Sequence, residues 1–254
     1  MHSNAMIPLI NRAWEIFHAK KDIGFIVKPS IPILFFGDVN AYFRSEQRVI
    51  TVGLNPSHHE FPKKNPFKRF RGAESTDPEI LHGKSYSRYI EILSDYFKEK
   101  PYSWFKCYDE IIRDAGVSYY ADKANTALHT DLYSPLATKP TWSGLKDAQK
   151  EVLGTEGIIL WHELVKVLEP DIIIASLGEK HLPKIAFHKI THKTDSFSVE
   201  GRFYSMEFSE VKIGKEKTAR LITGLASRRP FMRCKVEHRQ ELRGFIKDRM
   251  RKLK

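Results

Sequence analysis

The sequence predicts a three-layer α/β/α domain built around a central, mainly parallel four-stranded sheet. Four short apolar stretches, at residues 49–52, 126–132, 170–178 and 218–223, each lead into a loop that contains glycine or proline. Longer segments with apolar residues at helical spacing separate these stretches. Because strands that alternate with helices form parallel sheets with right-handed crossovers, the four loops are expected at one edge of the sheet.

The first of these strands runs directly into a stiff turn. Residues 49–52 read Val-Ile-Thr-Val, and Gly53 and Pro56 end the strand abruptly. Ligands of open α/β sheets bind at the carboxyl ends of the strands, so Asn55 is expected at the mouth of a cleft. The alternative is that Gly-Leu-Asn-Pro is only a tight turn, because Asn-Pro is common in turns.

We expect the chain to have four parts. They are an expression-vector scar (1–5), an N-terminal extension with a helix at 8–21 and a hairpin from 33–36 and 41–43 (6–47), the α/β domain (48–234), and a basic C-terminal helix (235–254). Within the domain, helical periodicity predicts helices at 86–98, 104–114, 145–168 and 182–190, the third of them interrupted near Gly154 and Gly157. A hairpin is predicted from residues 197–199 and 203–208.

Composition limits the function classes. The chain has 254 residues and carries 42 Lys and Arg against 31 Asp and Glu, a net charge of +11, which favours a polyanionic partner. No apolar stretch approaches the roughly 18 residues of a membrane span, and no secretory segment follows the start, so we expect a cytoplasmic protein without membrane contact. Two cysteines, Cys107 and Cys234, are too few for a disulfide framework or a thiolate metal cluster.

A long polar loop at residues 58–85, here called the basic loop, follows the first strand. Basic side chains alternate in it with Phe61, Phe67 and Phe70; the basic residues are Lys63, Lys64, Lys68, Arg69 and Arg71. Cations neutralise phosphates and aromatic rings stack on bases, so this mixture suits a nucleic-acid groove. A solvated loop anchored by three phenylalanines explains the pattern equally well.

Histidines raise the possibility of a metal site. They are His58, His59, His129, His162 and His181. Adjacent side chains such as those of His58 and His59 point apart, and no spacing typical of zinc ligands recurs along the chain. We therefore expect neither a metal nor a cofactor.

Taken together, four sequence pieces resemble the uracil-DNA glycosylase superfamily, in particular its mismatch-specific and single-strand-selective branches. The pieces are Gly53-Leu-Asn-Pro56, Asn65-Pro-Phe67 followed by Ser87-Arg-Tyr-Ile-Glu-Ile-Leu93, Thr130-Asp-Leu132 before a Pro-rich loop, and Pro170-Asp-Ile-Ile-Ile-Ala-Ser-Leu-Gly178. The resemblance covers roughly residues 48–234. It implies a uracil-DNA glycosylase-like fold and a monofunctional, monomeric DNA glycosylase acting on duplex or single-stranded DNA.

The resemblance also implies roles for individual residues. Asn55 matches the family residue that orients the attacking water, and Phe67, or else Phe61, matches the ring that stacks on the flipped base. Backbone amides around Gly53, Leu54 and Ser57 are expected to polarise the base carbonyl.

Two departures from the family pattern concern the base and its departure. Thr130 and Asp131 occupy the place of the usual uracil-reading Asn; an ionised Asp only accepts hydrogen bonds, which suits the exocyclic amino group of cytosine or a modified cytosine. A capping role for Asp131 is the alternative. The last motif, Gly224–Phe231, lacks the family His, so Ser227 is expected to contact a phosphate and Arg228 or Arg229 to support the leaving group or enter a groove.

The expected DNA contacts thus come from two regions, the basic loop and the last loop. They are Lys63, Lys64, Lys68, Arg69, Ser227, Arg228, Arg229 and Arg233. Two other function classes stay open: a nucleic-acid-binding or defence module with the same fold but no chemistry, and a hydrolase of small nucleotides. The second of these would show no salt-dependent affinity for DNA.

Overall fold

The structure is a computed structural model that describes residues 2–73 and 86–251, and the chain divides into two compact units. Unit 1 consists of Met1–Asn40, Gly53–Tyr102 and His129–Leu168. Unit 2 consists of Ala41–Val52, Ser103–Leu128 and Glu169–Lys254. The units interleave in sequence, and the boundary between them passes through the last residues of the first and third strands.

A mixed, mostly parallel sheet of seven strands is the main feature of unit 2. The strands are β1 (Val49–Gly53), β2 (Val117–Ser118), β3 (Asn125–Asp131), β4 (Ile172–Ala175), β5 (His188–Val199), β6 (Arg202–Lys212) and β7 (Thr218–Gly224). Their order is β2-β3-β1-β4-β7-β6-β5. β2 pairs with β3, β1 with β4 and β4 with β7 in parallel, whereas β6 is antiparallel to both β7 and β5. The predicted α/β class is confirmed.

The four strands predicted from the sequence are β1, β3, β4 and β7, and they are contiguous at the centre of the sheet. All residues of β1 and of β4 are buried, which explains why both strands are apolar apart from Thr51. The prediction of a four-stranded sheet was wrong, because the sheet has seven strands. β2 has two residues and gives no periodic signal, and β5 and β6 extend the sheet at its antiparallel edge.

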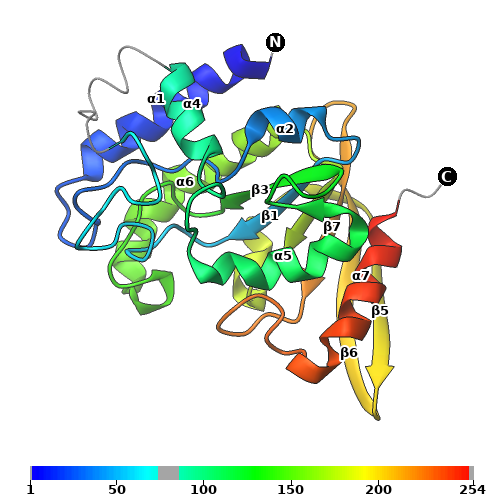
Figure 1. The fold of residues 1–254 in the computed structure, drawn as a ribbon. Coiled ribbons are helices and arrows are strands. Elements are labelled where there is room, and N and C mark those ends of the chain that lie inside the picture. Colours follow the sequence, from blue (N-terminus) through cyan, green and yellow to red (C-terminus); the bar gives the residue numbers. More distant parts are fainter. Residues whose placement is uncertain (1, 74–85, 252–254) are drawn as a thin grey trace. The chain divides into compact units, whose positions relative to one another are not determined.

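The β5–β6 hairpin turns at Glu200-Gly201, as predicted, but it is much longer than the predicted pair of short strands. Figure 1 shows it as a long two-stranded arm beside α7 (Arg239–Met250). The ring of Phe245 on α7 packs against Phe197 of β5 with 4.7 Å between centroids, and Arg249 forms an ion pair with Asp195. The helix therefore covers one face of the hairpin.

Unit 2 also contains the helix α5 (Lys106–Ile112), which packs against α7. The short helix α2 (Val39–Arg44) precedes β1; its first two residues belong to unit 1 and the others to unit 2. α5 ends in a 3-10 turn that stops at Gly116, whose φ of 80° requires the left-handed conformation that glycine adopts easily. The stop at Gly116 was predicted from the sequence.

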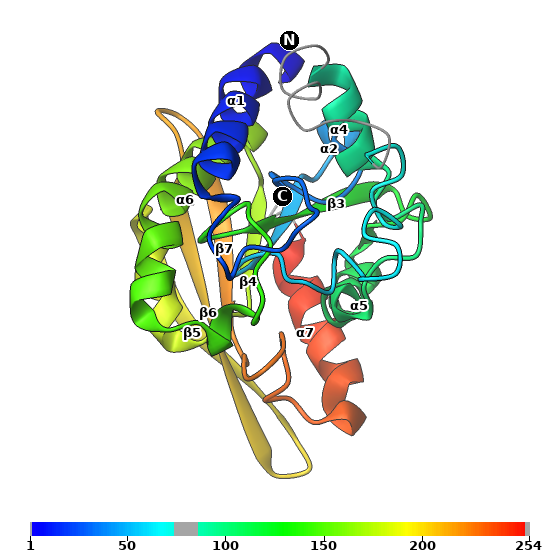
Figure 2. The same ribbon diagram turned by 90° about the vertical axis from the view of Figure 1, so that its left-hand side faces the viewer.

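Unit 1 is mainly helical. Its helices are α1 (His2–Lys20), α4 (Tyr86–Ser94) and α6 (Asp147–Leu168). α1 and α6 lie side by side, as Figure 2 shows, and Arg12 and Glu163 join them at 3.0 Å. Trp14 is completely buried on α1. Among the helices of the described residues, none has both the length and the apolar composition that crossing a membrane requires.

Three further predictions about elements were wrong. The hairpin expected within 33–43 is instead a buried extended segment followed by α2; Val39 and Tyr42, three residues apart, are both buried, which is a helical spacing. The helix expected at 182–190 is a 3-10 turn, Glu179–Lys184, followed by β5. Near Gly154 and Gly157 no break occurs, and α6 is continuous over 22 residues.

Candidate active site

Two loops of unit 1 are joined to each other along their length. The first loop, residues 53–58, follows β1, and the second loop, residues 132–138, follows β3. Four backbone hydrogen bonds link them. They are Leu132 N–H to Gly53 O (3.0 Å), Tyr133 N–H to Leu54 O (2.9 Å), Thr138 N–H to Pro56 O (3.2 Å) and His58 N–H to Thr138 O (3.0 Å). The ladder-like spacing fixes the position of each loop against the other.

Asn55 is held in one orientation by this pair of loops. Its side-chain Nδ2 donates to the carbonyl oxygen of Pro56 at 2.7 Å and to Oγ1 of Thr138 at 2.9 Å, with the carbonyl oxygen of Leu136 at 3.3 Å. Backbone carbonyls only accept hydrogen bonds, so the amide cannot be turned the other way. The side-chain oxygen, Oδ1, consequently faces away from these partners, and the residue is half-buried.

Gly53 lies directly against two polar side chains of β3. A Cβ atom at residue 53 would come within 2.4 Å of Oδ1 of Asp131 and within 2.7 Å of Nε2 of His129, so only glycine fits without a shift. The two side chains are 3.7 Å apart, and only 5% of the Asp131 side chain is exposed. The structure thus brings the predicted residues Gly53 and Asp131 together.

Glu60 adds a buried acid to this part of unit 1. It accepts a hydrogen bond from the hydroxyl of Tyr96, which itself accepts from the amide of Tyr102 at 3.1 Å. Burial raises the pKa of Glu60 to about 8; the Tyr96 hydroxyl and the charge of Arg69 act in the opposite direction, and the Asp131 carboxylate adds to the increase. Glu60 is therefore mainly protonated at neutral pH.

Three phenylalanines of the basic loop form a cluster. Phe61 stacks on Phe70 with 5.1 Å between ring centroids, and Phe67 contacts the edge of Phe61 at 6.2 Å. Phe61 and Phe70 are buried, whereas Phe67 is half-buried. Of the two rings predicted to stack on a base, Phe67 is the one with accessible surface, and buried Phe61 packs against it.

The basic side chains of this loop fall into two groups. Lys63, Lys64 and Lys68 are exposed, as phosphate contacts require. Arg69 is half-buried and donates from Nη1 to the carbonyl oxygen of His59 at 2.8 Å. Arg69 therefore has a structural bond in addition to any role in binding DNA.

The remaining predicted base-binding residues differ in accessibility. Leu54 and Ser57 are half-buried in the first loop, and the hydroxyl of Ser57 accepts from the amide of His59 at 3.3 Å. Thr130 is completely buried, and its Oγ1 accepts from the indole N–H of Trp161 at 3.0 Å. This hydroxyl is committed to the interior, so it is not available for the base contact expected from the sequence.

The last predicted loop, residues 224–234, belongs to unit 2. Its tip, Ser227-Arg228-Arg229, is exposed, while Leu225 and Phe231 on either side are buried with left-handed φ values of 56° and 59°. Ser176 at the end of β4 secures the loop: its hydroxyl donates to the carbonyl oxygen of Gly224 at 2.8 Å and accepts from the amide of Phe231 at 2.9 Å. Arg233 pairs with Glu179 at 3.1 Å. The exposed tip is thus positively charged, and the residues on either side of it are held in place by Ser176.

No protein-family model matches the chain, and no curated protein matches it. Among residues 2–73 and 86–251, no group of three or more His, Cys, Asp and Glu side chains is arranged to hold a metal ion.

Sequence reasoning did not identify Glu60, Tyr96 and His129 as parts of the site. His129 carried a usable signal, because it follows the apolar pair Ala127-Leu128 inside a strand with a buried centre and is 2% exposed. A buried polar residue in such a position needs a partner and often has a function. Glu60 carried none, since its burial depends on Tyr96, 36 residues away.

Proposed function

We propose that the protein is a DNA glycosylase-like enzyme that extrudes a damaged, mismatched or modified base and hydrolyses its N-glycosidic bond. The single observation that carries the proposal is the fixed amide of Asn55. Its nitrogen is committed to Pro56, Leu136 and Thr138, which leaves Oδ1 as a rigid acceptor at the end of a strand. A rigid acceptor is what the orientation of one water molecule requires.

The reaction proposed for this group is a substitution at C1′ of the sugar. The C1′–N bond breaks, the bonding electrons leave with the base, and the water oxygen forms the new bond to C1′ while its proton is lost to solvent. An amide is a weak base, but the electron-poor C1′ needs little help from the nucleophile, so orientation of the water by Asn55 Oδ1 is sufficient. No metal or cofactor enters this step.

Asp131 is the proposed determinant of the base. Its carboxylate lies against Gly53 in a nearly closed environment, where hydrogen bonds are stronger than in water. An ionised carboxylate accepts hydrogen bonds and does not donate them, so it favours a base with an exocyclic amino group and disfavours the carbonyl O4 of uracil. Cytosine and its modified forms are therefore the proposed substrates.

Binding of the strand is assigned to the basic loop. Phe67 offers an accessible ring for stacking, and the three exposed lysines offer charges for phosphates. The resemblance to the uracil-DNA glycosylase superfamily implies the stacking role of Phe67, and it adds a phosphate contact for Ser227 and a supporting charge from Arg228 or Arg229. The exposed, anchored tip of the last loop is compatible with these two contacts.

A nucleic-acid-binding module without chemistry is the second candidate. One observation favours it: the stretch Gly224–Phe231 contains no His, although the resembling family commonly uses one there to stabilise the departing base. In that case the net charge of +11 and the basic loop would serve binding alone.

The test is incubation of the protein with oligonucleotides that contain cytosine, 5-substituted cytosines, uracil, mismatched thymine or hypoxanthine, in single-stranded and duplex form, followed by alkaline cleavage at abasic sites. We expect cleavage at a cytosine-type base. Cleavage at uracil alone would refute the role of Asp131, and an absence of abasic sites with retained DNA affinity would favour the binding module. If the wild type cleaves at uracil alone, an Asp131→Asn variant should prefer the same base as the wild type.

A further inference from the structure

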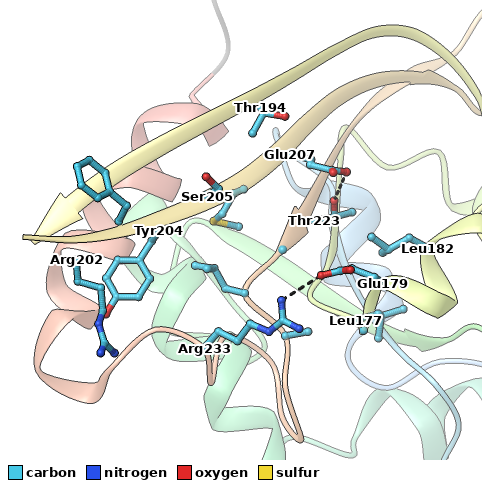
Figure 3. Close-up of a pocket in the computed structure, with 16 residues that line it drawn as sticks. Leu177, Glu179, Leu182, Thr194, Arg202, Tyr204, Ser205, Glu207, Thr223 and Arg233 are labelled. Atoms are coloured by element: carbon cyan, nitrogen blue, oxygen red, sulfur yellow. Dashed lines mark hydrogen bonds and ion pairs between the residues drawn. The ribbon is translucent and has the colours of Figure 1, made fainter.

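Unit 2 contains a pocket that the proposed reaction does not use. Its volume is about 500 Å³, and it lies where β4 and β7 end, between the 3-10 turn Glu179–Lys184 and the β5–β6 hairpin. Pockets of this size accommodate nucleotide-sized ligands, and the carboxyl ends of parallel strands are their usual location. Figure 3 shows the side chains that surround it.

Leucine side chains form part of the walls, and two carboxylates, those of Glu207 and Glu179, also line the pocket. Leu177, Leu182 and Leu225 line the pocket, and Glu207 enters it from β6. The hydroxyl of Thr223 donates to Oε2 of Glu207 at 3.3 Å, which fixes the carboxylate while leaving lone pairs on both oxygens. Glu207 is half-buried, and Ser205, two residues earlier in β6, lies on the same face of the strand.

Two guanidinium groups stand at the rim. Arg233 pairs with Glu179 at 3.1 Å, yet 60% of its side chain is exposed, so several of its five N–H donors point to solvent. Arg202, at the turn of the hairpin, is exposed and also lines the pocket. A ligand that fits must therefore combine a flat apolar body, neighbouring N–H donors at one end and an anionic group at the other.

We propose that this pocket binds a guanine nucleotide. Guanine is the standard base whose Watson–Crick edge presents two adjacent donors, N1–H and N2–H, and a carboxylate accepts both in a bidentate manner. The leucine side chains enclose the ring, and the phosphate binds Arg233. The nucleotide is either free in solution or part of a nucleic-acid strand, because the same contacts serve both. The proposal does not depend on Asn55.

The direct test is calorimetric titration of the full chain with GMP, IMP, AMP, CMP and UMP. IMP lacks the N2 amino group, so we expect its dissociation constant to be about tenfold higher than that of GMP. We expect Glu207→Gln to weaken GMP binding by about tenfold or more and to abolish the preference for GMP over IMP. Glu210→Gln, an exposed change on the same strand but outside the pocket, is the matched control and should leave both values unchanged.

Further experiments test the phosphate contact and whether the nucleotide is free or part of a strand. Arg233→Ala should weaken GMP but not guanosine, because only GMP carries the phosphate. A thymidine oligonucleotide with one internal guanine should bind if the pocket takes a strand, whereas a preference for GMP over this oligonucleotide identifies the free nucleotide. Asn55→Ala should bind GMP as the wild type does, so failure of the glycosylase proposal and failure of this one are distinguishable.

One outcome that overturns the proposal can be seen with the wild type alone. If the wild type binds no GMP at millimolar concentration, or binds all five nucleotides equally, the pocket does not read guanine. Equal weakening of GMP and IMP by Glu207→Gln, with an unchanged circular dichroism spectrum and thermal transition, would also overturn it, since the carboxylate would then not contact the N2 amino group.

Discussion

Replacement of Glu60 by Gln should change how the stability of the protein depends on pH. Burial raises the pKa of Glu60 from 4.5 to about 8 in the folded state. Between these two pH values the folded state holds a proton that the unfolded state has lost, so the free energy of unfolding of the wild type falls as pH rises. Gln has the shape of the protonated acid and never ionises, so the variant lacks this contribution.

The size of the effect follows from the two pKa values. Their difference, at 1.36 kcal/mol per pKa unit, corresponds to about 5 kcal/mol in total. About 4 kcal/mol of this lies between pH 5 and pH 9, because the unfolded side chain is already mostly ionised at pH 5. Relative to the wild type, Glu60→Gln should therefore gain about 4 kcal/mol of stability over this pH range.

Urea denaturation at pH 5, 6, 7, 8 and 9 measures this difference. Glu151→Gln is the matched control, because Glu151 is exposed on α6 and its removal should leave the pH dependence unchanged. Parallel stability curves for the wild type and Glu60→Gln across this range would refute the reasoning, since Glu60 would then have the same pKa in the folded and unfolded states.

Two further predictions concern packing and DNA binding. Gly157→Ala should lower the free energy of unfolding by about 1–3 kcal/mol, because its Cβ would lie 1.8 Å from the carbonyl oxygen of Tyr133. On α7, a Cβ added at Gly244 would have no atom within 4 Å, so Gly244→Ala should raise the free energy of unfolding by about 0.5–1 kcal/mol. If urea denaturation shows that both variants are more stable, or both less stable, than the wild type, this prediction is contradicted. Replacement of the three exposed lysines of the basic loop by Ala should reduce the slope of log K against log[salt] for DNA by about 2–3, measured by fluorescence anisotropy, and an unchanged slope would show that they do not contact phosphates.

The central strands could be predicted because buried strands consist mostly of apolar, β-branched residues. β1 and β4 are short, β-branched and buried throughout, and the loops after them contain glycine or proline. β5 gives the opposite signal. It is a polar edge strand, exposed along most of its length, so its sequence has no apolar alternation that would distinguish it from a loop.

The site was predictable only as far as topology determines it. Asn55 follows β1 and Asp131 is the last residue of β3; these strands are neighbours in the sheet, which explains why the loops after them meet. The raised pKa of Glu60 depends on packing by Tyr96 and on the charges nearby, none of which is local in sequence. Gly157 was misread as a helix break, because glycine lowers helix propensity; its actual role is to admit the backbone of Tyr133.

The most direct test of the central claim is the single-turnover rate of base release by Asn55→Ala, measured together with DNA affinity on the best substrate of the oligonucleotide panel. We expect the rate to fall by about 10²–10⁴-fold with little change in affinity, since Asn55 orients the water. Asn65→Ala, an exposed change in the basic loop, is the control and should react like the wild type. A rate for Asn55→Ala within about twofold of that of the wild type would contradict the account, because a water held by Oδ1 is worth far more than that.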